Sequence, residues 1–234
     1  MLNYVEYGKE NKYDDDIFFQ KYSQMSRSQQ GLAGAGEWET LRKLLPDFKD
    51  KRVLDLGCGY GWHCIYAMEH GASSVVGVDI SHKMLEVAKE KTHFPQVEYK
   101  CCAIEDVEFP EESFDVILSS LAFHYVADYE ILVKKIYRIL KSGGKLVFTV
   151  EHPVFTAYGT QDWYYNEKGE ILHFPVDNYY YEGKRTAVFL GEKVTKFHRT
   201  LTTYLNTLLS NGFIINHIVE PQRGIHDGYS GDAG

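Results

Sequence analysis

A glycine-rich turn flanked by two carboxylates is the part of the sequence with the clearest chemical meaning. Gly57, Gly59 and Gly61 follow the apolar run VLDL, and Asp55 lies within that run, two residues before the first glycine. Glycines let a ligand approach the bare backbone where a strand turns into a helix. Asp79 ends the next strand-like run, about 20 residues beyond the glycines, where a carboxylate can bind a ribose diol. These residues predict a site for a ligand that contains a ribose.

The spacing and charge of this turn distinguish between nucleotide cofactors. The glycines follow the pattern G-x-G-x-G, which differs from the G-x-G-x-x-G pattern that places a pyrophosphate on a helix N-terminus. The carboxylate of Asp55 would repel a diphosphate and attract a cation. S-adenosylmethionine carries a sulfonium and an ammonium but no phosphate, so the turn favours this cofactor over NAD.

The residues around the turn predict the sheet that must position it. Strand-like runs alternate with helical patterns between residues 51 and 150. Short strands separated by helices of about 10–15 residues imply right-handed crossovers and a parallel sheet that is covered on both faces. The predicted fold class is therefore α/β, with a doubly wound, mostly parallel, Rossmann-like sheet. The expected strands are residues 51–57, 74–79, 97–102, 114–120 and 145–151.

The alternation of strands and helices ends after the fifth strand. Residues 152–199 are rich in Tyr, Gly and mixed charges, and two strand-like stretches there flank Gly191. We interpret them as an insert that contains a β-hairpin. A helix is expected from about Thr200, followed by a strand over 213–220. The predicted organisation is an N-terminal aromatic lid segment (1–45), an α/β domain (46–220) that includes the insert, and a tail (221–234).

Aromatic residues are concentrated in two segments outside the α/β pattern. Of the 34 aromatic residues, 17 lie in residues 1–25 and 154–199, which are about a third of the chain. One interpretation is ordinary packing of two peripheral segments. The other is an aromatic-lined ligand pocket, because such pockets favour ring faces with polar edges.

Composition excludes several classes of partner. The formal charge of −8 provides no basic field that would attract a nucleic acid or an anionic membrane. No apolar run approaches the roughly 18–20 residues that span a bilayer, and the first residues lack the apolar stretch of a secretory signal. The cysteines and histidines have no metal-ligand spacing. We expect a cytoplasmic monomer or homodimer without a metal site.

Several motifs in sequence order resemble those of one enzyme family. They are VLDLGCGYG at the glycine turn, VVGVD before the second carboxylate, AIEDVEFPEESFD over 103–115 and RILKSGGKLVFTV over 138–150. Over residues 51–150 the chain closely resembles the class I S-adenosylmethionine-dependent methyltransferases, specifically the small "methyltransferase type 11" group. The resemblance implies S-adenosylmethionine as cofactor and S-adenosylhomocysteine as product.

The resemblance also implies roles for individual residues. The three glycines would shape the cofactor loop, and Asp55 would face the methionine end of the cofactor. Asp79 would bind the ribose hydroxyls beside Ile80. The remaining implied cofactor contacts are Ile104 and Glu105 at the adenine and Ser119 near the methionine.

Two departures from the family pattern affect these expectations. Ala103 occupies a position that is often Asp, so recognition of the adenine amine would fall to the backbone or to Glu105. The family's sheet commonly ends with a seventh, antiparallel strand that is not evident after residue 220. Either the sheet lacks that strand, or a strand of the insert or another subunit supplies it.

Four further residues are candidates for chemistry on the acceptor side. Glu151 and His152 leave the fifth strand at its carboxyl end, and either could orient or deprotonate the acceptor. His124, after the fourth strand, is a candidate base or a packing residue of the cofactor loop. Arg27 could bind a carboxylate of cofactor or substrate, or could be a solvated surface residue.

The function that these residues favour is transfer of a methyl group from S-adenosylmethionine to an oxygen or nitrogen nucleophile of a small molecule. Alignment of the nucleophile and exclusion of water can supply most of the acceleration of such a displacement. Two alternatives stay open at this level. One is a non-catalytic module that binds S-adenosylmethionine, and the other, opposed by Asp55 and the glycine spacing, is an NAD-dependent oxidoreductase.

Overall fold

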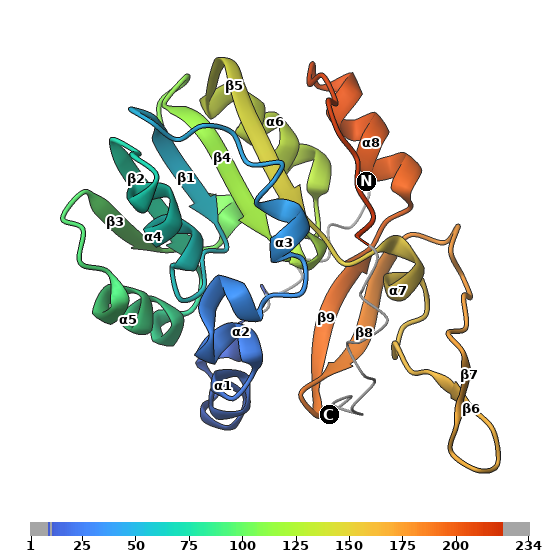
Figure 1. Ribbon diagram of the computed structural model, residues 1–234. Coiled ribbons are helices and arrows are strands. Elements are labelled where there is room, and N and C mark those ends of the chain that lie inside the picture. The colour runs from blue at the N-terminus through green and yellow to red at the C-terminus, as the bar shows by residue number, and fades with distance from the viewer. Residues whose placement is uncertain (1–8, 10, 222–234) are drawn as a thin grey trace.

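A parallel sheet forms the centre of the computed structural model, which describes residue 9 and residues 11–221. The strands are β1 (Arg52–Leu56), β2 (Ser74–Asp79), β3 (Val97–Cys101), β4 (Phe114–Ser120) and β5 (Leu140–Thr149). Their order in the sheet is β3-β2-β1-β4-β5, and all four neighbouring pairs are parallel (Figure 1). The order reverses at β1 and β4, which is where open α/β sheets bind ligands.

Helices cover both faces of this sheet. They are α4 (Trp62–Glu69), α5 (His82–Lys91), α6 (Tyr129–Ile139) and α8 (Leu201–Ser210). Successive residues of β1 point to opposite faces. Leu54 and Leu56 are buried in one apolar core with residues of α6 and α8, whereas Val53 is buried in a second core with residues of α4 and α5. Burial on both faces explains the uninterrupted apolar strands and confirms the predicted doubly wound fold.

The chain before β1 forms short helices at the end of the sheet toward which the strands run. They are η1 (Lys12–Asp14), α1 (Asp16–Ser23), α2 (Ser26–Gln29), η2 (Gly31–Gly34) and α3 (Trp38–Leu41). In Figure 1, α1 and α2 lie beside the loops that follow β1 and β2. The aromatic residues Tyr4 and Tyr7 of the predicted lid segment lie outside the described residues.

The insert after β5 contains the predicted hairpin and a second, smaller one. Its elements are α7 (Pro153–Ala157), β6 (Tyr164–Tyr165), β7 (Ile171–His173), β8 (Gly183–Phe189) and β9 (Glu192–His198). Strands β8 and β9 pair in antiparallel register. The turn between them places Leu190 and Gly191 at φ 54° and 76°, as a two-residue hairpin with the right-handed twist of the strands requires.

The N-terminal segment and the insert pack against each other. Phe18 of α1 has no exposed surface and forms an apolar cluster with Ala187 of β8 and Val194 of β9. Lys21 also donates a hydrogen bond from Nζ to the carbonyl oxygen of Leu190, at 2.9 Å. Two segments separated by about 170 residues therefore form one layer over the carboxyl ends of the strands.

The prediction of a strand over 213–220 is wrong. These residues belong to no helix or strand, and Ile214 and Ile218 are 85% and 55% exposed. A groove of about 1200 Å³ is lined by β5 on one side and by residues 212–221 on the other. The segment therefore does not pair with the edge of β5, and a β-rich sequence without a ladder partner is not a strand. Beyond Pro221 the predicted tail lies outside the described residues.

Candidate functional site

The glycine turn between β1 and α4 is shaped for close approach of a ligand. Gly57, Gly59 and Gly61 all have positive φ, of 78°, 52° and 75°. A Cβ at Gly57 would lie 2.5 Å from the Cβ of Ala122, and a Cβ at Gly61 would lie 2.2 Å from the hydroxyl of Tyr99. Any larger residue at Gly57 or Gly61 would therefore clash with a neighbouring side chain. Among the described residues, no atom lies within 4 Å of a Cβ built at Gly59, so this glycine leaves room for a ligand.

Asp79 lies at the carboxyl end of β2 and connects the glycine turn to α5. Its Oδ2 accepts a hydrogen bond from the backbone N–H of Gly59 at 2.8 Å, and its Oδ1 accepts one from the backbone N–H of Ser81 at 2.9 Å. Burial raises the pKa of this carboxyl group. A carboxylate oxygen accepts more than one hydrogen bond, so Asp79 retains capacity for two ribose hydroxyls. Ile80 follows it at the same edge and is partly buried.

Asp55 is a buried carboxylate with an unsatisfied oxygen. The residue is 1% exposed, its Oδ2 accepts a weak hydrogen bond from the thiol of Cys64 at 3.5 Å, and its Oδ1 has no hydrogen-bond partner in the part of the chain that the structure describes. Burial raises its pKa to about 7. A buried acceptor without a partner is unfavourable, and a cationic ligand would remove this penalty. The site therefore fits the charged methionine end of S-adenosylmethionine.

The residues expected near the adenine and the methionine lie at the same edge of the sheet. Ile104 is buried in η3 (Ile104–Asp106), and the backbone carbonyl of Glu105 accepts a hydrogen bond from Lys135 Nζ at 2.7 Å. Burial raises the pKa of the Glu105 carboxyl. Ser119 is buried in β4, where its hydroxyl donates to the carbonyl of Leu56 at 2.8 Å. Their contacts with the cofactor stay predictions.

Arg27 binds a carboxylate, and that carboxylate belongs to this chain. Its Nη2 donates to both oxygens of Glu37 at 2.8 Å. The hydroxyl of Ser120, at the end of β4, donates to the same side chain at 3.1 Å. Through Glu37, Arg27 is therefore anchored to the carboxyl end of β4. It is not a solvated surface residue. A direct contact between Arg27 and a cofactor or substrate stays a prediction.

Glu151 follows β5 and lies at the centre of a polar cluster. Lys196 of β9 donates from Nζ to Glu151 Oε1 at 2.5 Å and to Gln161 Oε1 at 2.9 Å, while Gln161 Nε2 donates to Glu151 Oε2 at 2.9 Å. Burial opposes ionisation of Glu151, but His124 and the ammonium of Lys196 lower its pKa below the ordinary value. Gln161 adopts a φ of 61°, which is uncommon outside glycine. The cluster therefore holds an ionised carboxylate in a fixed orientation.

His124 is a neutral, buried neighbour of Glu151. Burial lowers its pKa to about 4, so the imidazole carries no charge near neutral pH. Its Nδ1 lies 3.4 Å from the backbone N–H of Glu151, and its Nε2 lies 3.8 Å from Glu151 Oε1. This arrangement assigns the proton to Nε2, facing the carboxylate. Its one basic nitrogen, Nδ1, already accepts from the backbone N–H of Glu151, so His124 is placed to orient Glu151 and not to take a proton from the acceptor.

Both ring nitrogens of His152 contact residues of this chain. Nδ1 accepts a hydrogen bond from the backbone N–H of Val154 at 3.1 Å and so caps α7, while Nε2 lies 2.7 Å from Glu220 Oε1. An imidazole with both nitrogens engaged has none left for an acceptor. Of the two adjacent candidates, Glu151 is the better placed for chemistry.

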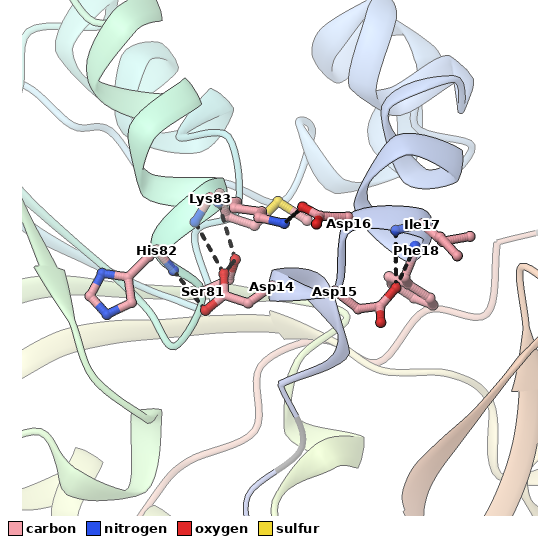
Figure 2. Close-up of polar contacts among 9 residues, drawn as sticks. Asp14, Asp15, Asp16, Ile17, Phe18, Ser81, His82 and Lys83 are labelled. Carbon is pink, nitrogen blue, oxygen red and sulfur yellow. Dashed lines mark hydrogen bonds and ion pairs between the residues drawn. The ribbon is translucent and has the colours of Figure 1, made fainter.

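Sequence reasoning missed two residues of this region, Lys196 and Asp14. In β9, Val194, Lys196 and His198 share the buried face of the strand. A lysine at a position expected to be apolar could have been recognised in the sequence as a candidate functional residue. Asp14 contacts the first turn of α5 (Figure 2). In the sequence, its only signal was its place in a run of three aspartates.

In the described part of the chain, no group of His, Cys, Asp or Glu could hold a metal ion, and no helix is long and apolar enough to cross a membrane.

Comparisons with known proteins agree with this geometry. A family model described as a methyltransferase domain matches residues 54–148. A solved S-adenosylmethionine-dependent methyltransferase of Mesorhizobium loti is 41% identical with a TM-score of 0.77, over 83% of this chain and 88% of that one. A solved Listeria monocytogenes protein assigned to the same class is 57% identical with a TM-score of 0.77, over 80% and 88% of the two chains.

A curated relative with a named reaction covers less of the chain. A ubiquinone biosynthesis O-methyltransferase of Coxiella burnetii is 36% identical over 112 residues, which are 47% of each protein. The chain thus matches about half of that enzyme. The two solved structures, which cover 80% and 83% of this chain, point to one conclusion together with the glycine turn, Asp79 and Asp55. The protein is an enzyme of the class I S-adenosylmethionine-dependent methyltransferases, type 11 group, with S-adenosylmethionine as its cofactor.

Proposed function

We propose that this enzyme transfers a methyl group to an oxygen or nitrogen nucleophile of a small molecule. The acceptor binds between the cofactor and the layer formed by the N-terminal segment and the insert. The observation that carries the proposal is the ionised Glu151, held by Lys196 and Gln161 at the carboxyl edge of the sheet. A fixed carboxylate suits an acceptor whose O–H or N–H must lose a proton as its lone pair attacks.

The enclosure of this edge supports a small acceptor. Tyr13 of η1 lies with its hydroxyl 3.5 Å from that of Tyr125, and the rings of Phe19 and Tyr22 contact Tyr60 of the glycine turn. Aromatic rings with polar edges at this position suit a compact organic molecule better than a polymer. The net charge of −8 adds to this argument, because it opposes binding of nucleic acids and anionic membranes.

The roles of the residues follow from their contacts. When bound, S-adenosylmethionine supplies an electrophilic methyl group, and its transfer leaves S-adenosylhomocysteine. Glu151 orients the hydroxyl or amine of the acceptor and receives its proton. Lys196 holds the carboxylate in place, and the neutral His124 contributes the facing N–H. The N-terminal segment and the insert exclude water, so alignment supplies most of the acceleration.

The experiment that tests this proposal measures S-adenosylhomocysteine formation with defined acceptors. The purified enzyme is given S-adenosylmethionine and panels of small phenols, alcohols, carboxylic acids and amines, and separately tRNA, DNA and protein substrates. We expect turnover with at least one small hydroxyl or amine compound. Turnover confined to the macromolecular substrates would contradict the proposal.

A further inference from the structure

Three consecutive aspartates at the start of α1 have three different partners. Asp15 accepts hydrogen bonds from the backbone N–H groups of Ile17 and Phe18 and so caps its own helix. Asp16 forms an ion pair with Lys83 of α5. Asp14 points away from α1 toward the first turn of α5 (Figure 2). Of the three aspartates, Asp14 is the one whose described contacts reach the backbone of α5.

The carboxylate of Asp14 acts as a second cap on α5. Its Oδ1 accepts hydrogen bonds from the hydroxyl of Ser81 at 2.6 Å and from the backbone N–H of Lys83 at 3.1 Å, and its Oδ2 lies 3.4 Å from the backbone nitrogen of His82. The first N–H groups of a helix lack partners within the helix, and negative charge is favourable there. Ser81 already caps α5 by accepting from the N–H of Met84. The helix therefore has its own cap without Asp14.

Ser81 connects Asp14 to the residue expected to bind the ribose. The same serine donates its hydroxyl to Asp14 and its backbone N–H to Asp79 Oδ1. Asp79 in turn accepts from the N–H of Gly59. A continuous chain of hydrogen bonds thus runs from the N-terminal segment through Ser81 and Asp79 to the glycine turn, and Ser81 itself has no exposed surface.

We propose that Asp14 is a positioning residue for the cofactor: it fastens the N-terminal segment over the ribose site and, through Ser81, fixes Asp79. The contact forms when the segment closes and breaks when it opens. Release of S-adenosylhomocysteine requires that opening, so the Asp14 contact sets how long the product stays bound. This inference rests on the cofactor and is independent of the acceptor proposed above.

Other contacts hold the segment when Asp14 is removed, which makes the inference testable. Phe18 stays buried against the β8–β9 hairpin, and Tyr22 contacts Tyr60. Although burial opposes ionisation of Asp14, hydrogen bonds from Ser81 and Lys83 lower its pKa. The group is therefore an anion at neutral pH, and Asp14→Asn keeps an acceptor oxygen while losing the charge.

The test measures the dissociation rate of S-adenosylhomocysteine by stopped-flow displacement in Asp14→Ala and Asp14→Asn. We expect release to be at least about tenfold faster in Asp14→Ala, the scale of a lost hydrogen bond to a charged group. Asp14→Asn should recover part of the difference. Hydrogen exchange of the backbone amides of residues 16–23 should be faster in Asp14→Ala without ligand and with it.

The matched control is Asp128→Ala, which removes the N-cap of α6, where Asp128 accepts from the N–H of Ile131. It should lower the melting temperature about as much as Asp14→Ala while leaving product release unchanged. Product release at the wild-type rate in Asp14→Ala would overturn the inference. Equal acceleration in Asp128→Ala would also overturn it, because the effect would then be one of general stability.

Discussion

Lys196 and Glu151 form an ion pair that joins the insert to the edge of the sheet, with 2.5 Å between Nζ and Oε1. The side chain of Lys196 is 3% exposed and that of Glu151 is 28% exposed. Breaking this pair is destabilising, because Glu151 would be left as a partly buried charge with Gln161 and His124 as its remaining polar partners. The pair therefore connects the stability of the insert to the chemistry of the acceptor site.

The first prediction is that Lys196→Met destabilises the protein. The expected loss is about 3 kcal/mol in the free energy of unfolding, measured by urea denaturation, because Glu151 loses its buried partner. The matched control is Lys141→Met, because the side chain of Lys141 is 43% exposed in its pair with Asp115, and this pair should contribute less than about 1 kcal/mol. Equal losses in the free energy of unfolding in the two variants would show that the Lys196 pair contributes no more to stability than the pair of Lys141.

The second prediction is that Glu151→Gln lowers kcat by at least about tenfold, since a positioned base contributes 10²–10⁴-fold. The affinity for S-adenosylmethionine should stay near that of the wild type. His152→Asn serves as the comparison, because the nitrogens of His152 already contact Val154 and Glu220. A wild-type kcat in Glu151→Gln would assign the cluster a structural role and leave catalysis to alignment alone.

The third prediction concerns Asp79. Asp79→Ala should weaken binding of S-adenosylmethionine by about 1.5–3 kcal/mol, the range for hydrogen bonds to a charged group, as measured by isothermal titration calorimetry. Asp115→Ala is the control, because Asp115 lies at the opposite end of the sheet, beside the N–H of Arg52. Unchanged affinity in Asp79→Ala would count against the assignment of the ribose site.

The fourth prediction follows from the raised pKa of Asp55, which is about 7 in the protein without ligand. A cation beside the carboxylate favours its charged form and lowers this pKa. Binding should therefore release a proton near pH 7, and affinity should rise as the pH increases from about 5 to 7. Calorimetry in buffers of different ionisation enthalpy measures the protons released. Asp55→Asn should remove this release, and its persistence in the variant would place the titrating group elsewhere.

The features that could be predicted from the sequence are those that depend on the pattern of neighbouring residues. The strands that alternate with helices, the glycine turn and Asp79 were readable because burial on both faces and the φ of glycine act within a few residues. The strand over 213–220 was predicted wrongly for the same reason, since β-propensity does not reveal whether a sheet edge accepts the segment. The contact between Asp14 and α5 joins residues more than 65 positions apart, and the Lys196 pair joins residues 45 apart. Such pairings arise from tertiary packing and leave little local signal.

The most direct test of the assigned cofactor site is a crystal structure of the enzyme with S-adenosylhomocysteine. In that structure the ribose hydroxyls should bind Asp79, the adenine should lie against Ile104, and the amino group of the ligand should lie toward Asp55 beneath a closed N-terminal segment. A ligand bound elsewhere in the fold, or bound at the glycine turn with Asp79 making no contact, would contradict the assignment.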